Sequence, residues 1–254
     1  MSVVPTVLLL RHGRTTANAS GTLAGWTPGV GLDEVGLAQA RAVGERLAAA
    51  GMPLARIVSS PLQRCQETAA AVLAELAGLA GGVPGVETDD RLGECRYGGW
   101  TGRPLTELAA EPLWRTVQDH PSAATFPPST EADGPAAESI AAMAARIVAA
   151  VRETDAAVDA AYGPRAVWLA VSHGDPIKAL LADAAGTHLD HFQRIHVDPG
   201  SISVVRYTER RPFVVRVNDV GGSLAGLIPP EPAHDQAEQD APVGGGAGPA
   251  TGAG

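Results

Sequence analysis

The sequence predicts an α/β protein in which helices cover both faces of a mostly parallel sheet. Three observations support this fold class. Short apolar runs recur along the chain, and each is closed by a polar or turn residue. Helix-forming segments separate these runs, and strands joined through helices pair in parallel. The chain has 254 residues, 45% of them hydrophobic, which is sufficient for a full core.

The predicted strands fall into two groups. Continuous apolar character is typical of strands buried on both faces, and it marks Thr6 to Leu10, Arg56 to Ser59 and Ala166 to Val171. Near the end of the chain, alternating apolar and polar residues around the turn at 208–211 predict a hairpin. Its two strands are expected at Ser201 to Tyr207 and Pro212 to Val217.

Four segments between the strands are predicted helices, and three of them carry start signals. Asp and Ser side chains accept hydrogen bonds from the free amides of a first helical turn, and Pro suits the first helical position. The helix from Ala136 is Ala-rich and is expected to reach Ala160. The three start signals are Asp33, Ser60 followed by Pro61, and Asp175 followed by Pro176.

The chain is predicted to contain one domain, residues 1–228, and a tail, residues 229–254. The tail holds four acidic residues, no Lys or Arg, many Gly and Pro, and Val243 as its one large aliphatic residue. Such a segment buries too little apolar surface to order itself, so we expect it to be disordered and to make no contact with the functional site. The stretch from Asp119 to Pro135 is expected to be a long surface loop or lid.

Charge and residue counts exclude several functions. The formal net charge of −9 is the wrong sign for binding nucleic acid or anionic lipid over a broad surface. Lys178 is the sole lysine and lies outside any P-loop pattern. Cys65 and Cys95 supply neither a disulfide scaffold nor a four-cysteine zinc site. No apolar run reaches the length of a membrane span, and the start of the chain does not read as a signal peptide, so we expect a cytoplasmic protein.

Two predicted strands run directly into a His-Gly pair. Arg11, His12 and Gly13 follow the first strand, and His173 and Gly174 follow the strand that begins at residue 166. Ligands of parallel sheets bind beyond the carboxyl ends of the strands, and glycine lets the backbone approach a ligand closely. The two imidazoles are therefore expected in one pocket.

A third and a fourth segment add an arginine and a glutamate. The segment Ser59 to Thr68 places Arg64 near the start of a helix, where free amides favour an anion. The alternative is that Arg64 pairs with Glu67 along the helix. The segment Arg91 to Trp100 sets Glu94 among glycines and aromatics, although an isolated glutamate is usually solvated.

These four segments, RHGRTTAN, SSPLQRCQETA, RLGECRYGGWTG and VSHG, resemble the histidine phosphatase superfamily in order and in content. The resemblance covers about Val7 to Val217. It implies a three-layer α/β/α sandwich and a first histidine that is transiently phosphorylated. It also places Tyr97 where phosphoglycerate mutases have a substrate-binding tyrosine.

The residues themselves indicate compatible chemistry. A neutral His12 can attack phosphorus, and Glu94, with its pKa raised by enclosure, can protonate the leaving oxygen and later activate water. No metal or other cofactor is needed, and the cluster of His188, His191, His196 and Asp190 is expected to be surface rather than metal-binding. The phosphoryl oxygens are expected to meet Arg11, Arg64, Asn18, Thr15 and, if it is protonated, His173.

The sequence therefore predicts a phosphomonoesterase acting on a small phosphorylated metabolite. One alternative is a cofactor-dependent phosphoglycerate mutase, but residues 103–162 contain no lysine and no adjacent arginines to hold a substrate carboxylate. A second alternative is a phosphate-binding or phosphoprotein-binding module without turnover, which would not need Glu94. The motifs do not select one phosphate ester and carry no signal for oligomeric state.

Overall fold

A six-stranded sheet forms the centre of the molecule. The computed structural model describes residues 4–78, 82–130, 134–222, 243–244 and 246. Within these ranges the strand order is β3-β2-β4-β1-β5-β6. The first four strands in the chain are parallel, whereas β5 pairs antiparallel with β1 and β6 antiparallel with β5. The strands are β1 Thr6–Arg11, β2 Leu54–Ser59, β3 Val86–Thr88, β4 Val167–Ser172, β5 Ile202–Tyr207 and β6 Pro212–Asp219.

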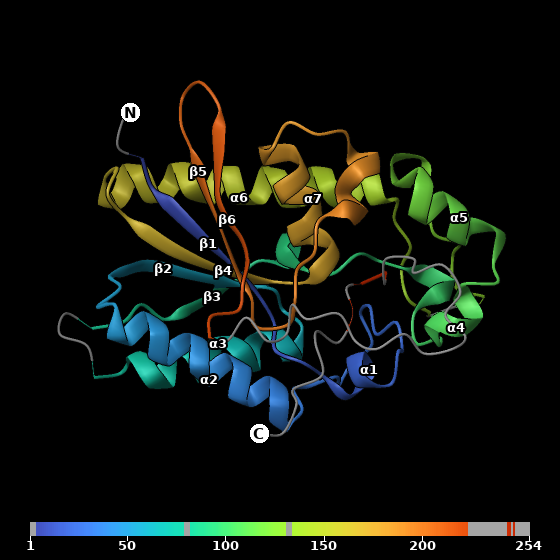
Figure 1. Cartoon of the computed structure of the whole chain (residues 1–254), viewed down its shortest axis with the longest axis horizontal. Helices are drawn as coiled ribbons and strands as arrows, with labels where there is room; N and C mark the ends of the chain where they lie inside the picture. The colour runs from blue at the N-terminus through green and yellow to red at the C-terminus, as the bar shows by residue number, and fades with distance from the viewer. Residues whose placement is uncertain (1–3, 79–81, 131–133, 223–242, 245, 247–254) are drawn as a thin grey trace.

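Helices lie on both faces of this sheet, which confirms the predicted three-layer α/β fold. Helices α2 and α3 cover one face, and α6 and α7 cover the other (Figure 1). No helix in the described ranges is both long and apolar enough to cross a membrane. The helices are α1 Thr16–Ala19, α2 Glu34–Ala49, α3 Gln63–Leu76, α4 Leu105–Leu108, α5 Pro112–Asp119, α6 Ile140–Tyr162 and α7 Gly174–Ala184.

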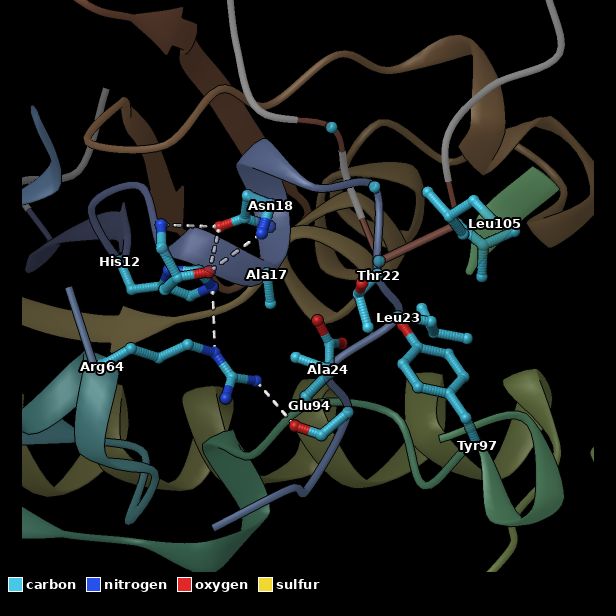
Figure 2. Close-up of a pocket in the computed structure, with 16 residues that line it drawn as sticks. His12, Ala17, Asn18, Thr22, Leu23, Ala24, Arg64, Glu94, Tyr97 and Leu105 are labelled. Carbon is cyan, nitrogen blue, oxygen red and sulfur yellow. Dashed lines mark hydrogen bonds between the residues drawn. The ribbon is translucent and has the colours of Figure 1, made fainter. Parts of the chain in front are cut away.

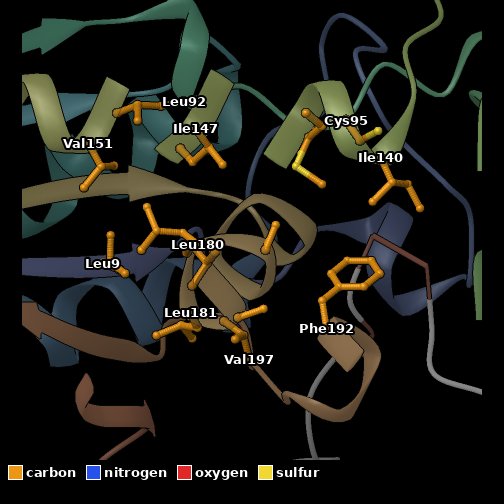
Figure 3. Packing of buried hydrophobic residues seen from close by; sticks show 14 of the residues in the cluster. Leu9, Leu92, Cys95, Ile140, Ile147, Val151, Leu180, Leu181, Phe192 and Val197 are labelled. Carbon is orange, nitrogen blue, oxygen red and sulfur yellow. The ribbon is translucent and has the colours of Figure 1, made fainter. Parts of the chain in front are cut away.

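The alternation of side chains along β1 divides the core in two. Val7 and Leu9 pack into the cluster that contains α6 and α7, whereas Leu8 and Leu10 pack with α2 and α3. Figure 3 shows Leu9 facing side chains of α6 and α7. Because both faces of β1 are buried, its carboxyl end is held firmly where the first histidine follows.

The predicted helix start, with Ser60 as the cap and Pro61 as the first helical residue, is wrong by two residues. Helix α3 begins at Gln63, and Leu62 precedes it without a side-chain cap. The Ser60 hydroxyl lies 2.8 Å from Nε2 of His173 instead. The same oxygen also accepts from the Leu62 amide at 3.3 Å, but Leu62 is itself the residue before the helix, so Ser60 does not cap the first turn.

The stretch expected to be a surface loop or lid is partly built into the core. Residues 131–133 lie outside the described ranges, but a short 3-10 helix covers Pro121–Ala123. Ala124 and Phe126 are buried, and the Phe126 ring lies edge-on to that of Tyr97, with centroids 5.0 Å apart. The described part of this segment therefore supports one wall of the site rather than moving freely over it.

The loop after β1 is seated on α2 by a backbone contact that only glycine allows. A Cβ added at Gly36 would lie 2.0 Å from the carbonyl oxygen of Arg14, and one added at Gly13 would lie 2.2 Å from that of Gly36. Side chains at these positions would push the loop away from the helix. The two glycines thus set the height of His12 above the sheet.

We predict that Gly36→Ala destabilises the protein by about 2 kcal/mol or more, because the added methyl group meets backbone that has no room to yield. Urea unfolding measures the change. Gly78→Ala is the matched control, because Gly78 has open space around it. Equal unfolding free energies for the two variants would contradict this account of the loop.

Candidate active site

Two loops that follow adjacent parallel strands form the base of the site. Arg11 at the end of β1 pairs with Ser172 at the end of β4, and the amide of His12 donates to the Ser172 carbonyl at 3.0 Å. The rings of His12 and His173 lie with centroids 5.1 Å apart. The structure thus brings the two histidines together, as their positions after the strands predicted.

The hydrogen bonds of His12 define its reactive nitrogen. Its Nδ1 lies 2.7 Å from the carbonyl oxygen of Gly13, so Nδ1 carries the proton and donates. Its Nε2 then accepts from Nε of Arg64 at 3.3 Å. Burial and the nearby Arg64 and Arg11 charges lower the pKa of His12 well below its ordinary value. His12 is therefore neutral, with the lone pair of Nε2 on the pocket side (Figure 2).

Arg64 belongs to the site and is not paired along its own helix. Besides His12, it donates from Nη2 to the Gly25 carbonyl at 2.8 Å, while its buried Nη1 has no hydrogen-bond partner. Glu67 instead accepts from the Leu32 amide and from Gln63, each at 2.7 Å. The alternative pairing of Arg64 with Glu67 is therefore wrong. A buried guanidinium with a free N–H is suited to an anionic ligand.

Glu94 lines the same pocket and is 3% exposed (Figure 2). Burial, together with the negative charge of Asp175, raises the pKa of Glu94 to about 7, although Arg64 opposes the shift. The carboxylate accepts a hydrogen bond from the Cys95 amide at 2.9 Å. Near neutral pH this side chain is available both as an acid and as a base.

Arg146 on α6 holds the backbone that carries Glu94. Its guanidinium donates to the carbonyl oxygens of Arg91 and Gly93 at 2.8 Å and of Glu94 at 2.7 Å. Glu138 in turn binds Arg146 at 2.7 Å. The sequence reasoning did not find Arg146, because the backbone carbonyls that it binds lie more than 50 positions away. The sequence feature that could have marked Arg146 is its charge within an Ala-rich helix.

His173 lies beside His12 but does not line the pocket. Its Nε2 contacts the hydroxyl of Ser60, and Sγ of Cys65 lies 3.4 Å from the same nitrogen. Burial, and then the charge of Arg64, lower its pKa well below the ordinary value. The expected protonated His173 is therefore not supported, and the positive charge of the site comes from the arginines.

Arg11 is buried, and burial lowers its pKa to about 10 against the opposing effect of Glu94. It donates from Nη1 to the Val197 carbonyl at 2.8 Å and from Nη2 to the Gly246 carbonyl at 2.9 Å. Arg11 therefore does not line the pocket, and its Nη2 donates to a residue of the C-terminal stretch.

Thr15 and Asn18 line the pocket from the first turn of α1. Thr15 caps this helix, and its amide and hydroxyl both donate to Oδ1 of Asn18, at 3.1 and 2.9 Å. The two side chains are thus bonded to each other. They border the space predicted for a phosphate without yet donating into it.

Tyr97 also lines the pocket, but its hydroxyl points to a buried carboxylate. It donates to Oδ2 of Asp175 at 2.8 Å. Lys178 lies 3.3 Å from the other oxygen of Asp175 and also bonds Gln193, and burial lowers its pKa. The sequence reasoning missed Asp175 as an organising residue, because it was interpreted as the start of a helix.

The C-terminal stretch reaches the site, contrary to expectation. Most of residues 229–254 lie outside the described ranges, so the predicted disorder of the tail concerns residues that the structure does not describe. Val243, Gly244 and Gly246, however, line the pocket. The expectation that the tail makes no contact with the site is wrong for these three residues.

Neither the histidine cluster nor the two cysteines form a second site in the part of the chain described. His188 lies 3.2 Å from Asp190, and His196 lies 2.9 Å from Asp198. The described residues contain no group of three or more His, Cys, Asp or Glu side chains placed to hold a metal. Both cysteines are buried, and burial raises their pKa values, that of Cys65 to about 12.

Comparison with known proteins identifies the family of the chain. A family model described as the histidine phosphatase superfamily (branch 1) matches residues 7–220. The chain belongs to this superfamily.

A bifunctional protein of Mycobacterium tuberculosis is 33% identical over 219 residues, which cover 85% of this chain and 54% of that protein. The chain thus spans about half the length of the first curated relatives it matches. A 2,3-bisphosphoglycerate-dependent phosphoglycerate mutase of Brucella melitensis is 32% identical over 197 residues, covering 77% of this chain and 88% of the mutase.

Solved structures of the superfamily share the fold. YhfR of Bacillus stearothermophilus superposes with a TM-score of 0.71 at 27% identity, covering 86% of this chain and 98% of YhfR. A mycobacterial glucosyl-3-phosphoglycerate phosphatase in complex with VO3 gives a TM-score of 0.65 at 28% identity, covering 84% of this chain and 98% of that enzyme. The solved structures that share this fold thus include a phosphatase.

We predict that Glu94→Gln stabilises the protein at pH 8 and not at pH 4. The folded-state pKa of Glu94, about 7, lies above its ordinary value of 4.5, so stability falls as pH rises through this window. The neutral amide removes that cost, which corresponds to a rise in Tm of about 2–5 °C at pH 8. Thermal unfolding at both pH values measures it. Glu45→Gln, at an exposed carboxylate, is the control; a gain independent of pH would oppose the assignment.

Proposed function

We propose that this chain is a phosphomonoesterase that transfers the phosphoryl group of a small phosphorylated metabolite first to His12 and then to water. One observation carries the proposal. A neutral imidazole, a buried guanidinium with a free N–H and a carboxyl group of raised pKa border one pocket. These are the nucleophile, the anion binder and the proton donor that such a transfer requires.

In the first step, Nε2 of His12 forms a bond to phosphorus as the bond from phosphorus to the ester oxygen breaks. Nδ1 keeps its proton and continues to donate it to the Gly13 carbonyl, so the imidazole keeps its orientation. Glu94, protonated, gives its proton to the leaving oxygen. Arg64 directs Nη1 to a phosphoryl oxygen and neutralises charge that accumulates in the transition state.

In the second step, the carboxylate of Glu94 takes a proton from water as the water oxygen attacks phosphorus. The bond from Nε2 to phosphorus breaks, and inorganic phosphate leaves. Glu94 ends protonated and His12 neutral, so the enzyme returns to its starting state. The same carboxyl group therefore serves as acid and then as base, for which a pKa of about 7 is suitable.

The lining of the pocket favours hydrolysis over a mutase reaction. Among the described residues on its outer side, most side chains are small or apolar, including Ala17, Leu23, Ala24 and Leu105. Arg64 is the one cation among the described lining residues. A mutase needs further cations to hold the substrate carboxylate while water is excluded. The mutase relative from Brucella makes phosphoglycerate the essential substrate to test.

We predict that His12→Ala reduces turnover of an aryl phosphate by at least about 1,000-fold, because no other imidazole borders the pocket in the described residues. The native enzyme should also form an acid-labile phosphoenzyme with labelled substrate, and the variant should not. A Tm close to that of the native protein verifies the fold. Activity within tenfold of native would remove His12 from its role.

The same preparation separates the two candidate reactions. With 3-phosphoglycerate and catalytic 2,3-bisphosphoglycerate, we expect little 2-phosphoglycerate, and release of inorganic phosphate from at least one monoester of a screened set. Isomerisation that outpaces phosphate release with every ester would assign the chain to the mutases.

We predict that Glu94→Gln slows alkyl phosphates about 100- to 10,000-fold but aryl phosphates much less, because a phenolate leaves without full protonation. For alkyl substrates, kcat/KM of the native enzyme should fall as pH rises above about 7, where Glu94 loses its proton. The variant should lack this decline. An equal loss on both substrate classes would indicate that Glu94 binds rather than protonates.

A further inference from the structure

Three residues of the C-terminal stretch fill the mouth of the pocket, and we call Val243, Gly244 and Gly246 the plug. The Gly246 carbonyl accepts from Nη2 of Arg11 at 2.9 Å. The Gly244 amide donates to Oδ2 of Asp175 at 3.0 Å. The Val243 side chain is 2% exposed and belongs to the main hydrophobic cluster. The plug is thus held by one contact to a cation, one to a carboxylate and one apolar contact.

The seat of Gly244 accepts glycine specifically. Its φ is +74°, which is strained for other residues. A Cβ at this position would lie 3.0 Å from Cδ1 of Leu23 and 3.3 Å from the Tyr97 hydroxyl oxygen. This position therefore requires glycine both for its positive φ and for its lack of a side chain. The plug thus fits its surroundings closely.

The plug and a substrate require the same space. With the plug in place the remaining cavity is about 30 Å³, room for on the order of one or two water molecules. A phosphate group with its alcohol is several times larger. The oxygen that meets Arg11 is the peptide carbonyl of Gly246, which is the type of contact that a phosphoryl oxygen would make. The ester therefore cannot enter until the plug leaves.

We propose that the mouth of the site is a docking surface for the chain's own plug, which acts as a built-in competitive inhibitor of phosphate binding. This rests on the proposed function of the site, because competition matters only if the pocket receives a phosphoryl group. Because the plug belongs to the same chain, its occupancy does not depend on protein concentration. The apparent affinity for a phosphate ligand is the intrinsic affinity reduced by the fraction of molecules whose plug is withdrawn.

Two variants loosen the plug through different contacts. Val243→Asp places a charge in the apolar seat, and Gly244→Pro removes the amide that Asp175 accepts and cannot adopt a positive φ. Val220→Asp is the matched control, since it makes the same substitution at a residue that is 50% exposed in the described chain. A chain shortened after Gly222 removes the plug altogether.

The decisive measurement is the affinity for inorganic phosphate by calorimetry, which requires no turnover. We expect it to tighten about tenfold or more in both plug variants and in the shortened chain, and to stay unchanged in Val220→Asp. KM for an aryl phosphate should fall by a similar factor with kcat little changed, because saturating substrate already displaces the plug.

The outcomes separate this proposal from the proposed function. Tighter phosphate binding without hydrolysis of any ester would support the plug and contradict the phosphatase assignment. Hydrolysis with phosphate affinity unchanged in all plug variants would contradict the plug alone. Weaker phosphate binding and lower kcat/KM in the variants would show that the segment is a wall of the substrate site, which also overturns inhibition.

Discussion

The contact between the Arg64 guanidinium and the His12 imidazole is the interaction on which the rest of the site depends. A permanent cation 3.3 Å from Nε2, at a buried site, keeps the ring unprotonated, so that Nε2 retains the lone pair with which it accepts from Arg64. The neighbouring strands β1 and β4 place the ring, and the start of α3 places the guanidinium. The sheet and the layer of α2 and α3 therefore contribute one partner each, so a shift of the loop after β1 relative to α3 would separate them.

Around this contact the buried charges of opposite sign balance one another. Arg11 and Arg64 face Glu94 and Asp175, and each pair lowers the cost of burying the other. The balance is incomplete at Glu94, because desolvation and Asp175 together outweigh the arginines. That residual imbalance is what gives the carboxyl group a proton to donate. Asp175 meanwhile accepts from Tyr97, which ties the electrostatics to the aromatic wall.

The sequence predicted those parts of the site that follow directly from strand ends. His12 and His173 come straight after apolar strands, and their convergence follows from parallel pairing. Arg146 and the plug were not predictable in this way, because their contacts join segments 52 to 235 positions apart. At Ser60 the local rule placed the helix cap two residues too early, and the hydroxyl contacts a tertiary partner, the buried imidazole of His173, that the sequence did not reveal.

The fate of the one lysine has a practical consequence. Lys178 is the sole lysine of the sequence, is 3% exposed and is bonded to Asp175 and Gln193. Reagents that acylate or cross-link lysine amines should therefore leave the folded molecule's side chains unlabelled. Labelling of Lys178 would then report the opening of α7 and its surroundings, giving a native probe of local unfolding without any engineered residue.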